Sequence, residues 1–155
     1  MKKNILVNPD KCDGCCTCML ACSFVKENEF STSKARIHIV KIAEKGLDLP
    51  VTCKHCIKAR CMEACVFNAI KRDKETGIVL VEQEACTGCG SCVTACPFGA
   101  ITIHPEKGTA LLCDLCGGDP ECVKFCVTGA IKFGALNTLA GTKRSKFGES
   151  MCRRG

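Results

Sequence analysis

Residues 86–97 read CTGCGSCVTACP, in which intervals of two, two and three residues separate four cysteines and a proline follows the last. A second ladder with the same intervals lies near the start of the chain, and two looser ladders complete the set. In chain order the four runs are Cys12, Cys15, Cys18 and Cys22; Cys53, Cys56, Cys61 and Cys65; Cys86, Cys89, Cys92 and Cys96; and Cys113, Cys116, Cys122 and Cys126. Such dense, regular thiol spacing is typical of metal binding in a reduced environment.

The four runs form an internal duplication. A shift of 74 residues aligns ILVNPDKCDGCCTCMLACSF at 5–24 with VLVEQEACTGCGSCVTACPF at 79–98, and a shift of 61 aligns CVFNAIK with CVTGAIK. The chain is therefore two copies of a two-run unit rather than a long array. In the first alignment Cys16 lies opposite Gly90, which identifies Cys16 as the extra cysteine of its run.

The composition indicates that metals hold this chain together. Its 155 residues include 18 Cys but no Trp, no Tyr and only 7 Phe, so a core of ordinary size is difficult to build. The N-terminal segment has too few consecutive apolar residues for a signal peptide, and no window reaches the roughly 18 apolar residues of a membrane helix. We therefore expect a cytoplasmic protein without a transmembrane segment, whose thiols stay reduced and bind metal instead of forming disulfides.

The spacing favours iron and sulfide over zinc. Three cysteines at intervals of two wrap a loop around three corners of a [4Fe-4S] cube, and the fourth, farther along the chain, points away from it. Paired CxxC knuckles also build structural zinc sites, but such sites have no need for the third and fourth cysteines of each run. The sixteen cysteines of the four runs, at four per cluster, predict four [4Fe-4S] clusters.

The net charge of the chain first suggests a nucleic-acid partner, but the charge of the predicted clusters removes that argument. A formal charge of +6 is typical of nucleic-acid binding, but four clusters at about −2 each bring the sum to +6 − 8, about −2. We therefore expect no nucleic-acid partner. The chain also lacks a glycine-rich nucleotide loop and a recognisable nucleophile or general base, so we expect no catalytic residues and no enzyme activity of its own.

The segments between the runs predict an α+β fold made of short elements. Apolar stubs at 69–70, 100–103 and 130–133 follow the last three runs and favour short strands, and turn-rich stretches lead into further strands at 78–81 and 110–112. These segments predict two antiparallel hairpins. The interval of three residues between the last two cysteines of each run places both on one face of a helical turn, so each run is expected to end in a short helix.

The four runs resemble the four-cluster, ferredoxin-like electron-transfer subunits of anaerobic redox complexes. The likeness rests on the Cys-Pro ending of the third run, on KHC at 54–56 and on CDLCGGDPEC at 113–122. That family includes iron–sulfur subunits of molybdenum and tungsten oxidoreductases and of formate, hydrogenase and carbon monoxide dehydrogenase complexes. The KARIHIV segment at 34–40 makes the chain most similar to the small polyferredoxin subunits of tungsten aldehyde oxidoreductases. The resemblance implies tandem bacterial-ferredoxin-like dicluster units.

In that family the first run pairs with the fourth and the second with the third. The resemblance therefore implies one four-cluster domain at 1–133, with a basic tail at 134–155. Its outer cluster pair would come from runs 12–22 and 113–126, its inner pair from runs 53–65 and 86–96, and the four clusters would form a line. The implied ligand sets are Cys12, Cys15, Cys18 and Cys126; Cys113, Cys116, Cys122 and Cys22; Cys53, Cys56, Cys61 and Cys96; and Cys86, Cys89, Cys92 and Cys65.

The function that the resemblance implies is electron transfer. The protein would relay single electrons between a large catalytic subunit that contains tungsten, molybdenum or nickel–iron and a second electron carrier or flavin subunit. A tungsten or molybdenum enzyme of the aldehyde oxidoreductase type is the favoured partner. A subunit of a carbon monoxide dehydrogenase or hydrogenase complex and a free-standing polyferredoxin are the alternatives, and a structural zinc protein is a distant one.

The three histidines lie outside the ligand ladders. His55, between Cys53 and Cys56, is expected to hydrogen-bond a ligand sulfur or to pack beside the cluster rather than to be a ligand. His38 and His104 have no metal-like neighbours in the sequence, so both are expected to be surface strand residues.

The cysteine-poor segments remain to be placed. The insertion at 23–52 is expected to be a docking surface rather than a solvated loop. The basic tail either binds an acidic partner or stays solvated, and Cys152 within it is expected to be a free thiol. Cys16 is expected to pack against a cluster as a small side chain.

Overall fold

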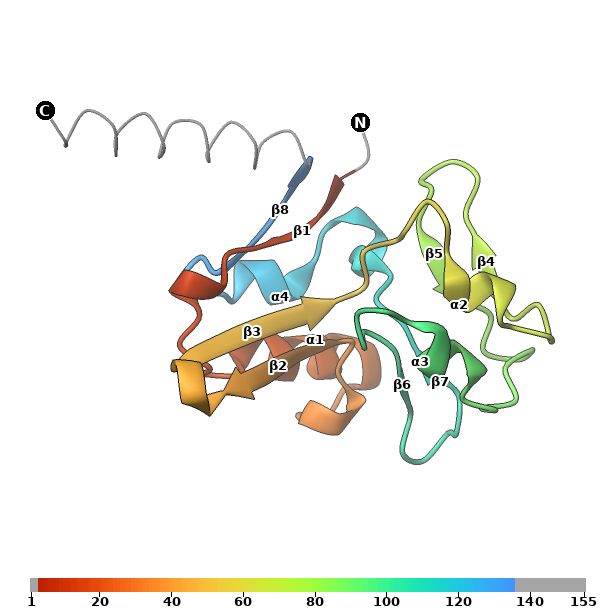
Figure 1. Cartoon of the computed structure of the whole chain (residues 1–155), viewed down its shortest axis with the longest axis horizontal. Coiled ribbons are helices and arrows are strands. Elements are labelled where there is room, and N and C mark those ends of the chain that lie inside the picture. Colours follow the sequence, from red (N-terminus) through yellow and green to blue (C-terminus); the bar gives the residue numbers. More distant parts are fainter. Residues whose placement is uncertain (1–2, 136–155) are drawn as a thin grey trace, which may run out of the picture.

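The computed structural model describes residues 3–135, which contain eight short strands, four α-helices and four short 3-10 helices (Figure 1). The strands are β1 (Lys3–Val7), β2 (Ile37–Ile42), β3 (Leu47–Thr52), β4 (Ile70–Arg72), β5 (Val79–Val81), β6 (Thr102–Ile103), β7 (Ala110–Leu111) and β8 (Ile131–Ala135). The α-helices are α1 (Thr17–Glu27), α2 (Arg60–Glu63), α3 (Ser91–Ala95) and α4 (Glu121–Lys124). Cys152 and all but the first two residues of the predicted basic tail lie outside the described residues.

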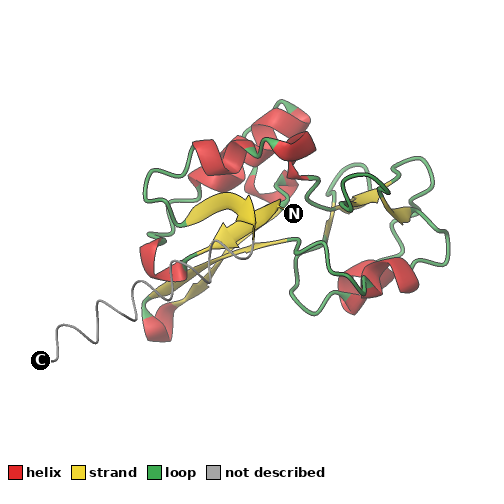
Figure 2. Ribbon diagram, turned by 90° about the horizontal axis from the view of Figure 1, so that it is seen from above, coloured by secondary structure: helices red, strands yellow, loops and turns green. Residues whose placement is uncertain are grey.

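The chain folds into two lobes, one built from the two ends of the described segment and one from its middle (Figures 1 and 2). In the lobe built from the two ends, which we call the outer lobe, β1 pairs antiparallel with β8, with Leu6 opposite Lys132, and α1 packs against α4. In the lobe built from the middle, which we call the inner lobe, α2 packs against α3. The first cysteine run therefore lies beside the fourth, and the second beside the third.

Both predicted hairpins form. β4 pairs with β5, with Ile70 opposite Val81, and β6 pairs with β7, with Ile103 opposite Ala110. Each run carries its third cysteine inside a helix, and only α1 is long enough to contain the fourth, Cys22. The insertion at 23–52 comprises the second half of α1 and a further antiparallel hairpin, β2–β3.

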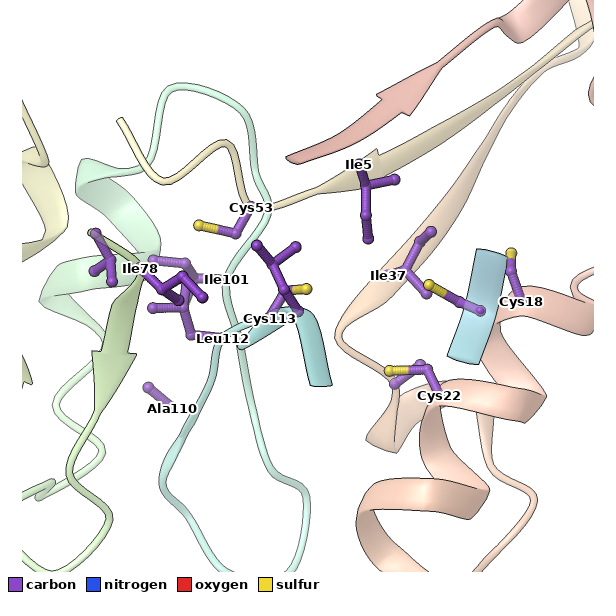
Figure 3. Close-up of a cluster of buried hydrophobic side chains, with 14 of the residues drawn as sticks. Ile5, Cys18, Cys22, Ile37, Cys53, Ile78, Ile101, Ala110, Leu112 and Cys113 are labelled. Carbon is purple, nitrogen blue, oxygen red and sulfur yellow. The ribbon is translucent and has the colours of Figure 1, made fainter. Parts of the chain in front are cut away.

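The apolar core is thin and contains many thiols. Its most buried members are largely isoleucines, such as Ile5 at 2% and Ile37 at 1% exposure. Figure 3 shows Cys53 and Cys113 among these side chains, with Ile78 beside them. Since thiols occupy so many core positions, we expect the fold to depend on what the thiols bind.

Gly88 fixes the third run against the β6–β7 turn. It has a φ of +69°, and a Cβ at this position would lie 1.8 Å from the carbonyl oxygen of Gly108. The repeat-related Gly14 has the same φ, and a Cβ there would lie 2.6 Å from the Asp48 carboxylate. Glycine is required at Gly88 both by its backbone conformation and by the close approach of the neighbouring turn.

Gly88→Ala is expected to destabilise the protein by about 3 kcal/mol or more, because the backbone must move to relieve the contact with Gly108. Gly90→Ala is the matched control: Gly90 has a φ of +78°, but an added Cβ meets nothing within 4 Å. That control is expected to cost only about 1–2 kcal/mol. Anaerobic urea unfolding, followed by loss of visible absorbance, measures both. Equal losses would contradict the role given to the Gly108 contact.

A buried glutamate joins the two lobes. The Glu27 side chain, at the end of α1, is 7% exposed and accepts a hydrogen bond from Arg36 at 3.0 Å. It also pairs with Lys107 in the β6–β7 turn of the other lobe. Burial raises the pKa of Glu27, but the hydrogen bonds from Lys107 and Arg36 outweigh it and hold the pKa below its ordinary value.

Lys34 makes a second connection between the insertion and the same turn. Its side chain is 7% exposed and lies 2.5 Å from Glu29 and 2.7 Å from Glu106. The hydrogen bonds that Lys34 donates to both carboxylates raise its pKa, and the larger effect comes from Glu106. The insertion is therefore fastened to the inner lobe by two charged side chains that are largely withdrawn from solvent.

His104 is buried, so the prediction of a surface strand residue is wrong. Its Nδ1 accepts hydrogen bonds from the backbone N–H groups of Glu106 and Lys107 at 3.2 and 3.1 Å. The neutral ring then carries its proton on Nε2, which lies 3.5 Å from Oε2 of Glu27. His104 therefore belongs to the contact between the lobes. His38, in β2, is only partly buried, and burial lowers its pKa.

Glu27→Gln is expected to lower the free energy of unfolding by about 2–4 kcal/mol, because it removes the buried charge that pairs with Arg36 and Lys107. Glu82→Gln is the control, since the Lys71–Glu82 pair has side chains that are 62% and 52% exposed. Its loss is expected to stay within about 0.5 kcal/mol. Denaturant titrations of both variants measure the two losses. A Glu27 variant as stable as the control would contradict the role of Glu27 in joining the lobes.

Candidate metal centres

Three pockets are lined by thiols that come from two runs each. In each pocket one run supplies the first three cysteines of its ladder, and the run packed beside it supplies its last cysteine. The groups are Cys12, Cys15, Cys18 and Cys126; Cys53, Cys56, Cys61 and Cys96; and Cys86, Cys89, Cys92 and Cys65. Within residues 3–135 no three His, Cys, Asp or Glu side chains are placed to hold a single metal ion.

The fourth group consists of the remaining thiols, at the contact between α1 and α4. The pKa of Cys122 is raised first by burial and then by the neighbouring thiols Cys113, Cys22 and Cys116. Burial raises the pKa of Cys113 to about 11. An ion pair of 2.6 Å between Lys26 and Asp114 fastens α1 to the fourth run beside this group.

The four groups follow one another through the molecule. A thiol of one group raises the pKa of a thiol in the adjacent group, as a secondary cause after burial: Cys18 raises that of Cys122, Cys113 that of Cys53, and Cys61 that of Cys92. The groups therefore form a series that starts with the Cys126 group and ends with the Cys65 group. Cys15 and Cys89, in the first and last groups, are the exposed thiols of the described chain.

Backbone N–H groups already point at several of these sulfur atoms. Three of them donate at 3.3 Å: Arg36 to Cys22, His55 to Cys53, and Ala110 to Cys86. N–H···S bonds of this kind stabilise a thiolate and tune the potential of a bound cluster. Arg36 and Ala110 lie outside the cysteine runs, and a backbone donor leaves no signal in the sequence. The thiol groups of four and their donors fit [4Fe-4S] clusters.

His55 closes the loop of the second run. It is 2% exposed with a φ of +45°, and its ring Nδ1 accepts a hydrogen bond from the N–H of Val79 at 3.0 Å. Because Nδ1 accepts, the neutral ring carries its proton on Nε2, although Nδ1 lies 3.7 Å from the Cys53 sulfur. The hydrogen bond to Cys53 thus comes from the backbone of His55, while its ring fastens the loop to β5.

Cys16 adopts the conformation of the glycine that it replaces. Its φ is +60°, against +78° at Gly90, and both residues cap the start of a helix. Its sulfur donates toward the carbonyl oxygen of Gly14 at 3.3 Å. Cys16 also lines the pocket of the first group, beside Cys12. It therefore lies next to the candidate ligands with its thiol turned to the backbone.

A family model described as a 4Fe-4S dicluster domain matches residues 45–136, which include the second, third and fourth runs. The chain belongs to the 4Fe-4S dicluster domain family. Among the helices of this dicluster protein, none within residues 3–135 is long and apolar enough to cross a membrane.

Individual relatives agree with the family. The dicluster protein is 42% identical over 122 residues to the aliphatic sulfonate oxidoreductase, polyferredoxin-like subunit, of Pyrococcus furiosus, which covers 79% of this chain and 70% of that protein. It is 36% identical over 146 residues to the thiosulfate reductase electron transfer subunit PhsB of Salmonella typhi, with coverage of 86% and 76%.

A solved structure shares the fold. The active site complex BamBC of benzoyl coenzyme A reductase with 1,5-dienoyl-CoA matches with a TM-score of 0.52 and 26% identity, over 85% of this chain and 75% of that chain. The predicted family of iron–sulfur electron-transfer subunits is therefore confirmed, as are its ferredoxin-like dicluster domain and its multiple [4Fe-4S] clusters.

Cys16→Ala is expected to leave the iron and sulfide content of the purified protein unchanged, because the Cys16 thiol is turned to the Gly14 carbonyl. Cys18→Ala, in the same pocket, is the matched control and is expected to lose about four irons. Anaerobic iron and sulfide determination compares the two variants. Loss of iron from Cys16→Ala alone would show that the ladder of the first run has been misassigned.

Proposed function

We propose that the protein relays single electrons through four [4Fe-4S] clusters arranged in a line. The observation that carries the proposal is the sorting of the sixteen run cysteines into four adjacent groups. When bound, each cluster would supply reversible one-electron redox chemistry. The residues of this chain hold the clusters, exclude water from them and set the distances between them.

The proposed ligands are the sixteen cysteines of the four groups. Every group contains at least one buried thiol, and each terminal group also reaches the surface through one exposed thiol, Cys15 or Cys89. This arrangement supports a relay with its ends open to partners. Burial raises the pKa of Cys18 and of Cys53 to about 12, so metal binding must displace protons from these thiols.

We further propose that the protein serves a large catalytic oxidoreductase subunit and catalyses nothing alone. The named functions of its relatives, an aliphatic sulfonate oxidoreductase subunit and a thiosulfate reductase subunit, support a catalytic partner of this general kind. We also propose that the catalytic partner contains tungsten or molybdenum, that the second partner is an electron carrier or a flavin subunit, and that the protein is cytoplasmic. The α+β class and the single four-cluster domain at 1–133 are part of the same proposal.

The iron content tests the proposal. Anaerobically purified protein is expected to contain about sixteen irons and sixteen sulfides per chain, with a visible band that bleaches on reduction. Metal analysis of a co-purified partner would identify tungsten, molybdenum or nickel. A content near eight irons would contradict the four-cluster relay, and a colourless protein that contains zinc would replace it with a structural site.

A further inference from the structure

The pocket of Cys53, Cys56, Cys61 and Cys96 differs in charge from the other two cysteine pockets. Lys54, Lys58 and Arg60 line it, and none of its lining residues is acidic. The pocket at Cys89 is lined by no charged residue, and Asp13 is the charged residue that lines the pocket at Cys15. Among these three pockets, positive charge is therefore concentrated at that of the third proposed cluster in the series.

Ile57 lies in the chain between Cys56 and Lys58, two residues that line this pocket, and it is 93% exposed, more than any other large apolar side chain in residues 3–135. The loop that presents it is fixed, because the Arg72 guanidinium donates to the carbonyl oxygens of Cys56 and, at 3.2 Å, of Ile57. A fixed backbone that displays an isoleucine to water gains no packing for the apolar surface it exposes. Such a residue is suited to contact with another molecule.

The charged neighbours of Ile57 are also free for a partner. Lys58 and Arg60 are exposed, and no carboxylate within the described part of the chain forms an ion pair with either. Phe98, 48% exposed, lines the same pocket and adds apolar surface. The acidic residue on α2, Glu63, does not line the pocket. We call Ile57, Lys58, Arg60 and Phe98 the basic rim.

We propose that the basic rim is the docking site for a small electron-carrier protein with an acidic surface. An apolar centre surrounded by charge is a common composition of an interface, and opposite charge speeds diffusional encounter. A patch of four residues, two of them charged, suits a carrier that docks transiently rather than a permanent subunit. The docked carrier loses one electron and is oxidised, and this protein gains it and is reduced, with no bond formed or broken. The proposal rests on the electron-transfer function proposed above.

The direct test compares two charge-reversed variants that carry the same total charge. Lys58→Glu with Arg60→Glu alters the rim, whereas Lys41→Glu with Lys45→Glu alters exposed lysines around the β2–β3 hairpin. The electron donor is a reduced two-cluster bacterial ferredoxin with an acidic surface, and reduced methyl viologen, a small cation, is the reference donor. At low salt the rim variant is expected to slow the ferredoxin reaction by about tenfold or more, against less than about threefold for the control.

Two further measurements do not depend on turnover. Carbodiimide cross-linking of the ferredoxin to the wild-type protein is expected to join a ferredoxin carboxylate to Lys58, as located by mass spectrometry. Ile57→Ser is expected to weaken ferredoxin binding by about tenfold without changing its salt dependence. Val66→Ser, at a side chain 77% exposed elsewhere in the inner lobe, is the matched control and is expected to bind as the wild type does.

Several outcomes would overturn the docking site. One is equal slowing of the ferredoxin reaction by the two charge-reversed pairs, and another is cross-linking at lysines other than Lys58. A third is a rim variant that shifts the midpoint potential of the clusters but reacts with ferredoxin at the wild-type rate. If the rim variant loses iron, the neutralised pair Lys58→Ala with Arg60→Ala repeats the comparison, with slowing of about threefold expected.

Reduction by methyl viologen separates the two proposals. If methyl viologen reduces the protein but ferredoxin does not bind, the docking site fails and the relay stands. If methyl viologen does not reduce the protein either, the relay itself fails.

Discussion

The last cysteine of each run lies with thiols of a different run, and the whole fold depends on this exchange. Cys126 lies with the first run and Cys22 with the fourth, which requires α1 to pack on α4 and the two ends of the described chain to meet as β1 and β8. Cys65 and Cys96 impose the same relation on α2 and α3. A cluster bound by such a group closes a long loop, so metal binding and folding are a single process.

The same exchange brings thiolate groups close together, and cationic side chains at the contacts between runs offset their negative charge. Burial raises the pKa of Cys22, and the backbone N–H and side chain of Arg36, together with Lys26, act to lower it. Burial lowers the pKa of Lys54, and the thiols of Cys53, Cys113 and Cys56 act to raise it. The excess of basic residues is therefore partly structural. The exposed Lys58 and Arg60 differ from this set because no carboxylate of the described chain pairs with them and solvent reaches both.

Local features of the fold could be predicted from the sequence, because ligand spacing and strand alternation are local patterns. The helix at each run and the two hairpins belong to this class. The contact of Glu27 with Lys107 and His104 could not be predicted, since the residues are distant in the sequence and each alone has the character of a surface residue. Gly88 and Gly90 show the same limit within one run. Both have positive φ, but only Gly88 meets the backbone of another element; the repeat keeps glycine at Gly14 and places Cys16 opposite Gly90, yet it does not show which element Gly88 contacts.

The duplication explains why the insertion at 23–52 packs as it does. Gly14 and Gly88 are equivalent by the repeat, and the atoms nearest to them come from equivalent places: Asp48 in the β2–β3 hairpin and Gly108 in the β6–β7 turn. Each of these hairpins follows its run and closes over the loop between the first two cysteines of that run. The β2–β3 hairpin is thus the enlarged counterpart of β6–β7 rather than an added module. The loop of Ile57 differs from both hairpins, because its side chain is 93% exposed and is open to contact with a partner.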